Sequence, residues 1–581
     1  MILQALTEYY RTLEQQGRIA APGWGPVKAS FALCIDAGGT LRQVSSIQTE
    51  QIRGKKRVLA PQIMQLPAPV KRTVGVAANF LCDNSSYMLG DDDKGRPERA
   101  RQCFESCKAL HEQVLGEVDS DAARAVVAFF RKWKPEDVRR NPALAESLEE
   151  ILSGSNLVFR TEAGYAHEDP AVRRAWEAHY NAAGDGPQGI CLVTGERGPV
   201  ESIHPAIKNV AGAQSSGAAL VSFNAPAFCS YGKQQNFNAP TGKYAAFAYT
   251  AALNRLLADR EHVYRVGDAT VVCWARGGGD FYQSLFGWAV MGQPEPAYDE
   301  SELRGMVKQL CRGQAVEFHA ERLDPEMDFY ILGLSPNAAR LSVRFFLRNT
   351  FGGFLRNVQA HQERLRIVRP AFDKFEELPI WKLLGETVNA NTRDKAASPI
   401  LAGELLRAVL NDARYPATLL NGVTLRIRAE REVTRGRAAI LKAYYLKNPH
   451  PDIPKEVLTV ALNEEASNVP YTLGRIFSVL EAIQSAANPG INATIKDKYF
   501  NSAAATPAVI FPLLINLAQK HLKKLRSGSA GLAVTYDKQL TQLLSRLGEQ
   551  FPARMNLPQQ GAFQLGYYHQ TQARYQNKEE N

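Results

Sequence analysis

One short stretch of the chain has the residues with which sugar kinases and their relatives hold a nucleotide phosphate. Asp36–Thr40 reads Asp-Ala-Gly-Gly-Thr and lies between two apolar runs. In those kinases a glycine turn brings backbone N–H groups and a hydroxyl close to the anion. The stretch also suits a β-hairpin turn, because Gly38 and Gly39 can adopt positive φ without strain. The kinases need a second Asp-Gly loop, and the other glycine run, Gly277–Phe281, places its aspartate after the glycines. We therefore favour the hairpin turn, with a nucleotide-dependent enzyme as the alternative.

Other patterns for catalysis or metal binding are absent from the sequence. The eight cysteines are spread over the first 311 positions, and the closest pair, Cys103 and Cys107, has no second Cys or His pair nearby. A structural zinc site usually takes four ligands from two such pairs, so free thiols in a reducing cytoplasm are favoured. The ten histidines form no H-E-x-x-H motif, and no G-x-x-x-x-G-K-[ST] loop is present. The sequence predicts no catalytic residue, no metal ligand and no cofactor.

The polar loop within Phe223–Tyr244 has the residue types that read nucleic-acid bases. It carries a run of one lysine and three amides: Lys233, Gln234, Gln235 and Asn236. Amides pair with base edges, lysine holds phosphates, and an amide or aromatic tip can wedge open a base step. The alternative is an ordered connection whose amides cap its own backbone.

A similar polar cluster lies within Pro69–Gly90. Lys71 and Arg72 precede an apolar run, and Asn79 and Asn84 follow in a turn. These residues are second candidates for contact with a nucleic acid. The alternative here is a strand and a turn with ordinary surface charge.

Arginines are concentrated in two further stretches. Between Arg340 and Arg369 there are seven arginines against one glutamate, and the strand-like alternation places Arg340 and Arg344 on one face. We expect Arg340, Arg344 and Arg348 to contact phosphates. Arg426, Arg428 and Arg431 lie in a basic helical stretch of the kind that lines a groove for a displaced single strand.

Several elements must position these residues. Strand-like runs cover 30–35, 41–47, 189–195, 218–223 and 268–275, helical patterns cover 121–133 and 242–259, and a turn is expected at Ser335–Asn337. From about Phe375 the pattern is almost wholly helical. The predicted fold class is α+β and multi-domain: a mixed α/β region over 1–290, a basic α/β connecting region over 291–374, and an all-α bundle over 375–581.

Composition sets the broad class. The chain has 581 residues, 45% hydrophobic and 22% charged, and its net charge is +10. No apolar run reaches the roughly 18 residues of a membrane span, and no signal peptide is apparent at the N-terminus, so a cytoplasmic protein is expected. The positive charge favours polyanionic partners.

Long, specific motifs add a family resemblance. They are NFLCDNSSYMLG, HPAIKNVAGAQSSGAALVSFNAPAFCSYGKQQNFNAP, ILGLSPNAARLSVRFF and YTLGRIFSVLEAIQSAANPGINATIKDKYFNSAAATPAVIFPLL. With these motifs the chain resembles, from its N-terminus to about Tyr568, the large subunit of type I-C CRISPR interference complexes, which are called Cascade.

The resemblance implies a non-catalytic subunit for antiviral defence. Such a subunit recognises the protospacer-adjacent motif in double-stranded DNA, promotes unwinding and R-loop formation, and helps recruit the helicase-nuclease. Its implied partners are the guide CRISPR RNA, the target DNA, the repeated backbone subunit, the 5′-handle-binding subunit and the small subunits, which the C-terminal bundle resembles. A plain RNA-binding scaffold is the other alternative.

The resemblance assigns no individual motif-reading residue, so the candidates rest on physical grounds. We expect motif reading or wedging by Lys233, Gln234, Gln235, Asn236, Asn79 and Asn84, and phosphate contacts by Lys71, Arg72, Arg340, Arg344 and Arg348. The path of the displaced strand is assigned to Arg426, Arg428 and Arg431.

Overall fold

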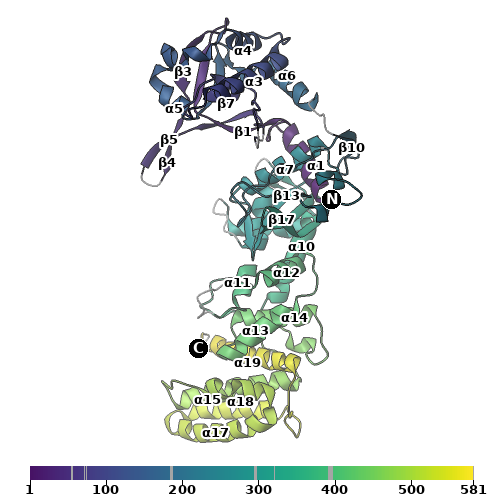
Figure 1. The fold of residues 1–581 in the computed structure, drawn as a ribbon. Helices are drawn as coiled ribbons and strands as arrows, with labels where there is room; N and C mark the ends of the chain where they lie inside the picture. The colour runs from purple at the N-terminus through teal and green to yellow at the C-terminus, as the bar shows by residue number, and fades with distance from the viewer. Residues whose placement is uncertain are drawn as a thin grey trace. The chain divides into compact units, whose positions relative to one another are not determined.

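The computed structural model describes residues 1–53, 56–70, 72, 75–182, 187–292, 298–318, 321–389 and 397–579 (Figure 1). The chain forms two compact units. The first comprises Met1–Pro205 and Val221–Leu253, and the second comprises Ala206–Leu220 and Asn254–Asn581. Helices and small sheets both contribute, which confirms the predicted α+β, multi-domain class.

The first unit is built around a five-stranded mixed sheet with the order β3-β2-β8-β7, in which β9 also pairs with β8. The strands are β2 (Phe31–Ile35), β3 (Leu41–Ser46), β7 (Cys82–Asn84), β8 (Asn156–Thr161) and β9 (Gly164–Tyr165). β2 runs parallel to β8, and the other pairs are antiparallel. The positions of β2 and β3 agree with the strands predicted over 30–35 and 41–47.

Helices pack on this sheet around an aromatic core. They are α2 (Ser85–Met88), α3 (Pro97–Leu115), α4 (Asp121–Lys132), α5 (Leu148–Leu152) and α6 (Pro170–Ala182). The side chain of Ser120 accepts a hydrogen bond from the Ala123 N–H and caps the start of α4, as serine does at helix N-termini. Phe129 and Phe130 of α4 meet the ring of Phe159 on β8 edge to face, at 5.2 and 5.6 Å between centroids. The helix predicted over 121–133 is confirmed.

Other segments of this unit form a helix and two-stranded ribbons. They are α1 (Ile2–Gln15), β1 (Trp24–Ala29) with β6 (Gln62–Pro67), β4 (Thr49–Arg53) with β5 (Lys56–Ala60), and β10 (Gln188–Ile190) with β11 (Arg197–Pro199). The strand predicted over 189–195 was too long. It ends at Ile190 because the Gly195 N–H donates to the Cys191 carbonyl at 2.8 Å and closes a turn there.

The second unit contains a four-stranded antiparallel sheet with the order β12-β13-β16-β17. The strands are β12 (Tyr264–Val266), β13 (Ala269–Ala275), β16 (Asp328–Asn337) and β17 (Arg340–Thr350). Alternate residues of three strands, among them Cys273, Ile331 and Phe345, enter the large hydrophobic core of this unit. The sheet joins strands from both sides of the boundary predicted near residue 290, so that boundary does not separate two folding cores.

Two local predictions for this sheet were wrong. The turn expected at Ser335–Asn337 lies at Ala338–Ala339 instead, because strand pairing continues to Asn337 and Arg340; Ala338 adopts φ 52° there. Strict alternation along β17 is also interrupted. Val343 lies opposite Leu334 and Phe345 opposite Gly333, which leaves Arg344 as a bulge with no residue opposite it.

The strand predicted over 218–223 is not a strand in the described part of the chain. Ala218 and Ala219 form only isolated bridges, to Ile207 and Arg340 respectively. This apolar run therefore has no continuous partner strand to pair with. By contrast, the helix predicted over 242–259 is confirmed as α7 (Lys243–Ala258).

Helices make up most of the remaining second unit. They are α8 (Phe281–Phe286), α9 (Glu300–Cys311), α10 (Phe351–Leu365), α11 (Ile380–Gly385), α12 (Pro399–Leu410), α13 (Ala417–Glu430), α14 (Arg435–Lys447), α15 (Val469–Ala487), α16 (Ile495–Ala505), α17 (Pro507–Gly528), α18 (Ala530–Leu544) and α19 (Leu557–Glu579), with a short ribbon of β14 (Val316–Phe318) and β15 (Glu321–Leu323). None of the helices within the described ranges is long and apolar enough to cross a membrane.

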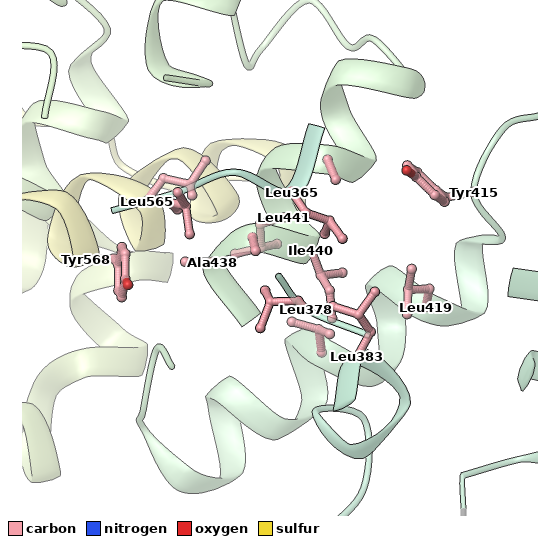
Figure 2. Packing of buried hydrophobic residues seen from close by; sticks show 14 of the residues in the cluster. Leu365, Leu378, Leu383, Tyr415, Leu419, Ala438, Ile440, Leu441, Leu565 and Tyr568 are labelled. Carbon is pink, nitrogen blue, oxygen red and sulfur yellow. The ribbon is translucent and has the colours of Figure 1, made fainter. Parts of the chain in front are cut away.

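One core continues across the boundary predicted at residue 374. Figure 2 shows Leu365 of α10 and Leu378 gathered with Leu441 of α14 and with Leu565 of α19. All four side chains are almost fully buried. The C-terminal helical region is confirmed as helical, and it shares this core with the preceding segment.

Two helices of the bundle approach unusually closely. A Cβ added at Gly474 of α15 would lie 1.9 Å from the Phe563 carbonyl oxygen of α19, and one at Gly566 would lie 2.1 Å from the Tyr471 carbonyl oxygen. The absence of a side chain at both glycines is what lets the two backbones touch. This contact anchors α19 against the centre of the bundle.

Candidate nucleic-acid interface

The polar loop at Cys229–Asn238 projects its tip into solvent. Tyr231 is 98% exposed, and Lys233, Gln234 and Gln235 are also exposed. The last three side chains make no hydrogen bond or ion pair with any residue that the structure describes. Their donors and acceptors are therefore available to a ligand.

The backbone of this tip is held in place by Asn238. Its Oδ1 accepts from the Ser230 N–H at 2.8 Å, and its Nδ2 donates to the carbonyls of Lys233 and Gln235 at 3.3 and 2.9 Å. Tyr231 and Gln235 adopt φ of 54° and 46°, in the left-handed region that side-chain-bearing residues rarely occupy. Such strained residues persist where surrounding contacts determine the backbone, and they are common at functional sites.

Asn236 requires a correction. It was predicted to read bases with its neighbours, but its side chain is only 2% exposed. The short 3-10 turn at Gln235–Asn238 turns it inward, and its Oδ1 has no hydrogen-bond partner among the described residues. Asn238, which was not among the predicted site residues, has the organising role instead; the signal for it was an amide closing the same polar loop.

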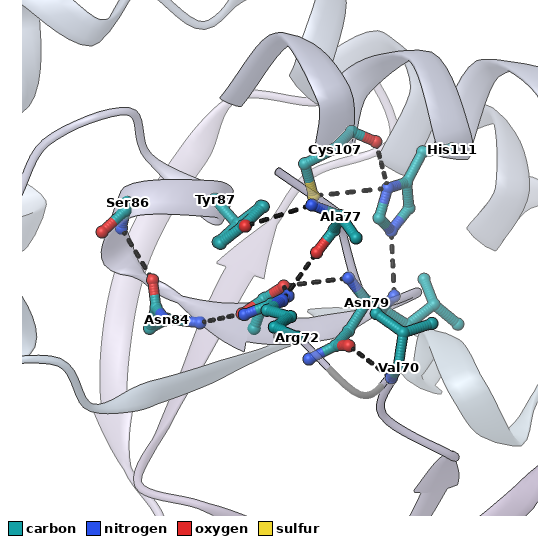
Figure 3. A network of polar contacts seen from close by, with 11 residues as sticks. Val70, Arg72, Ala77, Asn79, Asn84, Ser86, Tyr87, Cys107 and His111 are labelled. Carbon is teal, nitrogen blue, oxygen red and sulfur yellow. Dashed lines mark hydrogen bonds and ion pairs between the residues drawn. The ribbon is translucent and has the colours of Figure 1, made fainter. Parts of the chain in front are cut away.

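The second polar cluster is organised by Asp83, which is 1% exposed. Figure 3 shows Arg72, Asn79 and Asn84 of this cluster close together. The Arg72 guanidinium donates to both carboxylate oxygens of Asp83, at 3.0 Å for the Nη1–Oδ1 contact, and its Nε donates to the Ala77 carbonyl at 2.6 Å. The guanidinium also lies 3.9 Å from the centre of the Tyr87 ring. Burial alone lowers the pKa of Arg72, but the hydrogen bond and charge of Asp83 outweigh it and raise that pKa.

The structure brings Asn79 and Asn84 to the same carboxylate. Their backbone N–H groups donate to Asp83 at 2.9 and 2.8 Å. The side-chain oxygen of Asn79 accepts from the Val70 N–H, and that of Asn84 accepts from the Ser86 N–H at the start of α2. Both side-chain oxygens therefore cap local backbone. The predicted phosphate contact at Lys71 lies outside the described residues.

The β17 arginines differ in their surroundings. The side chains of Arg344 and Arg348 are half exposed and pair with Asp268 and Asp328, the latter at 3.2 Å. Arg340 is partly buried at the start of the strand. Because of the bulge at Arg344, the three arginines do not follow one uninterrupted two-residue period.

The arginines of α13 are only partly free. Arg426 pairs with Glu430 at 3.5 Å, and Arg428 donates to the Gln560 side chain at 2.8 Å. Arg431 ends the helix in the left-handed conformation, with φ 57°, and its side chain is exposed. Of the three, Arg431 has the side chain most accessible to a ligand.

The Asp36–Thr40 stretch is a hairpin turn, as favoured from the sequence. It connects the antiparallel pair β2 and β3, and the Asp36 carboxylate accepts from the N–H groups of Gly38 and Thr40 at 3.0 and 2.9 Å. The hydrogen bond from the Thr40 N–H and the contacts from Arg42 lower the pKa of Asp36. The N–H groups that would hold a phosphate in a kinase are thus occupied by the protein's own carboxylate.

Among the titratable groups elsewhere, His262 lies 2.7 Å from a carboxylate oxygen of Asp259 and 2.9 Å from the hydroxyl of Ser284, the order of contacts of a Ser-His-Asp triad. No group of three or more His, Cys, Asp or Glu side chains there could hold a metal ion. Burial raises the pKa of Cys82 to about 12 and lowers the pKa of His111 to about 4. The pKa shifts of Cys82 and His111 are those of protein interiors, so neither group marks a site.

Comparison with known families gives one match that spans almost the whole chain. The family model described as CRISPR-associated protein (Cas_Csd1) matches residues 6–575. No curated protein matches the sequence.

Proposed function

Because the chain belongs to the Cas_Csd1 family of CRISPR-associated proteins, we propose that it is the large subunit of a type I-C Cascade complex. In this proposal it recognises the protospacer-adjacent motif in duplex DNA and starts the opening of the two strands. It is non-catalytic, and a recruited helicase-nuclease cuts the target. Pairing between guide RNA and target strand supplies the remaining specificity, the same division of labour as in other RNA-guided effectors.

The exposed tip of the Cys229–Asn238 loop is the observation that carries motif recognition. A glutamine amide offers one donor and one acceptor side by side, which match the edge of adenine in the major groove. Gln234 and Gln235 present two such amides from a backbone that Asn238 already holds. Because this order exists before DNA binds, less conformational entropy is lost on association.

The same tip has the side chains needed to start strand separation. Tyr231 is almost fully exposed beside Gly232, which adopts φ 68°. Side chains inserted between base steps unstack them and kink the duplex, at a cost of about a few kcal/mol per step. Lys233, between the aromatic and the amides, is placed to neutralise a phosphate close to the opened step.

The half-exposed arginines Arg344 and Arg348 support phosphate contacts. Their ion pairs with Asp268 and Asp328 are of the surface type, which contributes at most about 1 kcal/mol. An arginine can therefore leave such a carboxylate and bind a DNA phosphate with little loss of free energy. Arg431 is the best placed of the α13 residues for the displaced strand, because Arg426 and Arg428 already have partners.

The experiment is duplex binding by guide-loaded complex, assembled with and without this chain, with the motif varied and the salt held constant. We expect high-affinity binding, and its dependence on the motif, only when the chain is present. Gln234→Ala combined with Gln235→Ala should flatten discrimination between motif sequences while binding to non-motif DNA stays the same. The matched control is Gln43→Ala with Gln102→Ala, which removes two exposed amides of the same unit elsewhere.

Two results would contradict the proposal in different ways. If the complex without the chain binds with unchanged affinity and motif preference, the chain is a scaffold for RNA and other subunits. If the chain is required but the glutamine variant discriminates as well as its control, the motif is read elsewhere on it. The substitutions Arg344→Ala and Arg348→Ala should instead weaken binding to all DNA sequences and lower the salt slope by about one per lost phosphate contact.

A further inference from the structure

A cavity of about 490 Å³ opens beside the Asp83 cluster in the first unit. Four cationic side chains line it, namely Arg72, Lys94, Arg96 and Arg99, and among the described lining residues the only carboxylate is Asp92. Its charges and glycines lead one to expect a solvated loop over Gly90–Gln102, but α3 begins within this stretch at Pro97. The fold places Lys94, Arg96 and, from the first turn of α3, Arg99 next to Arg72, which lies more than twenty positions earlier in the chain.

The inner wall of the cavity is preorganised. Asp83, the Ala77 carbonyl and the Tyr87 ring hold the Arg72 guanidinium from three sides. A guanidinium has five N–H donors, and these contacts use three of them. Two donors remain on a cation that is already fixed in position. An immobilised arginine with spare donors is suited to an oxygen-rich anion.

The outer wall carries three cations, two of which have no partner among the described residues. Lys94 and Arg96 are exposed, and their side chains make no hydrogen bond or ion pair with any residue in the described ranges. Arg99 donates to the Gly75 carbonyl at 3.1 Å, which holds it at the cavity. The carboxylate of Asp92 is itself engaged by the Ser86 hydroxyl at 2.5 Å and by the Lys94 backbone N–H at 3.0 Å.

We propose that this cavity binds a phosphate group of a nucleic-acid chain. Four cations converging on a polar cavity fit an anion with several oxygens, and the volume admits a phosphate together with its sugar. The inference rests on the proposed function only for the source of that phosphate. Either the DNA duplex that carries the motif or the guide RNA presents the same phosphodiester chemistry.

The test compares Lys94→Ala/Arg96→Ala with the wild type in the full chain. The matched control, Arg101→Ala/Lys108→Ala, removes the same charge from α3 at residues outside the cavity lining. One arm measures binding of guide RNA by the chain, and the other measures duplex binding by guide-loaded complex, both over a series of salt concentrations. Lys94→Arg/Arg96→Lys preserves the charge and should restore binding.

We expect the cavity variant to lose affinity in only one of the two binding measurements, either for guide RNA or for duplex DNA. Each lost phosphate contact lowers the salt slope by about 0.9 for duplex DNA or about 0.7 for single-stranded RNA, and weakens binding about four- to fivefold near 0.15 M salt, while the control changes much less. A loss in the RNA arm assigns the phosphate to the guide, and a loss only in the DNA arm assigns it to the target. If the cavity variant and the control behave alike in both arms, the proposal is wrong.

This outcome is separable from that of the proposed function. The cavity variant should keep its ratio of affinities for different motifs, whereas the Gln234/Gln235 variant should change that ratio and keep its salt slope. If the cavity variant behaves like its control while the glutamine variant changes the ratio of affinities for different motifs, the cavity proposal is wrong and motif reading by the loop is supported. If the cavity variant loses affinity while the glutamine variant keeps the wild-type ratio of affinities, phosphate binding in the cavity is supported and motif reading by the loop is wrong.

Discussion

The Nδ2 of Asn238 donates to the Gln235 carbonyl at 2.9 Å, directly beneath the most exposed part of the loop. One amide thereby fixes the backbone that displays the amides of Gln234 and Gln235. The same side chain accepts from the Ser230 N–H, so it ties both limbs of the loop together. A loop ordered by its own side chain before it meets DNA is the physical basis of the recognition that we propose.

Replacing Asn238 with alanine should weaken motif discrimination without unfolding the protein. Its three hydrogen bonds are at the surface, and each contributes about 0.5–1.5 kcal/mol to the order of the loop. We expect a several-fold loss of discrimination in duplex binding and a melting temperature within a few degrees of wild type. Asn238→Asp keeps the acceptor but loses both donors, so its effect should be intermediate. Undiminished discrimination in both variants would show that loop order is unimportant.

The contact between α15 and α19 should tolerate no side chain at Gly474. Alanine there would place its Cβ 1.9 Å from the Phe563 carbonyl oxygen, so the helices must separate. Overpacking of this kind costs about 1–3 kcal/mol or more, measurable by chemical denaturation. Gly531 of α18 is the control, because nothing lies within 4 Å of its Cβ position. Gly531→Ala should be stabilising by up to about 1 kcal/mol, since alanine favours helix over glycine. A neutral Gly474→Ala would contradict the close approach.

Stability should fall in mild acid because of buried neutral histidines. Desolvation lowers the pKa of His111 to about 4 and of His361 to about 3, from the usual value of 6.5. The unfolded state thus binds protons that the folded state excludes. The stabilisation is complete above about pH 6.5 and is lost progressively as the pH falls toward these folded-state values. Each histidine contributes a slope of up to about 1.4 kcal/mol per pH unit in the free energy of unfolding.

The histidine prediction has a direct control. The Nδ1 of His361 lies 2.6 Å from the Tyr415 hydroxyl, and glutamine at this position keeps a hydrogen-bonding group without titrating. His361→Gln should reduce the slope of unfolding free energy against pH between about pH 4.5 and 6.5, by up to about 1.4 kcal/mol per pH unit, because one fewer proton is bound on unfolding. An unchanged slope would show that protonation of His361 does not contribute to the loss of stability in acid.

Removal of the Asp36 carboxylate should affect stability and not nucleotide binding. The carboxylate accepts from two backbone N–H groups of its turn and pairs with Arg42 at 2.7 Å. Asp36→Ala should therefore lower the melting temperature, while calorimetric titration with ATP detects no binding to either protein. ATP binding by the wild type that disappears in the variant would revive the kinase interpretation.

Sequence patterns alone identified the features that depend on a few neighbouring residues. The hairpin at Asp36–Thr40 follows from its glycines and the strands that flank it, and α4 follows from a helical apolar period. Over most of its length the C-terminal region is helical for the same reason. The long motifs also indicated the family, because a match over almost the whole chain does not require knowledge of the fold.

Only the tertiary structure decided which polar residues are available to a ligand. Asn236 and Gln235 are neighbours of similar chemistry, yet one is buried and the other exposed. Arg72 is a surface cation by sequence, but Asp83 binds it and makes it the inner wall of a cavity completed by Lys94 and Arg96. The reason is physical: local propensity acts over one turn or strand, whereas burial, ion pairing and cavities depend on segments that meet only after the chain has folded.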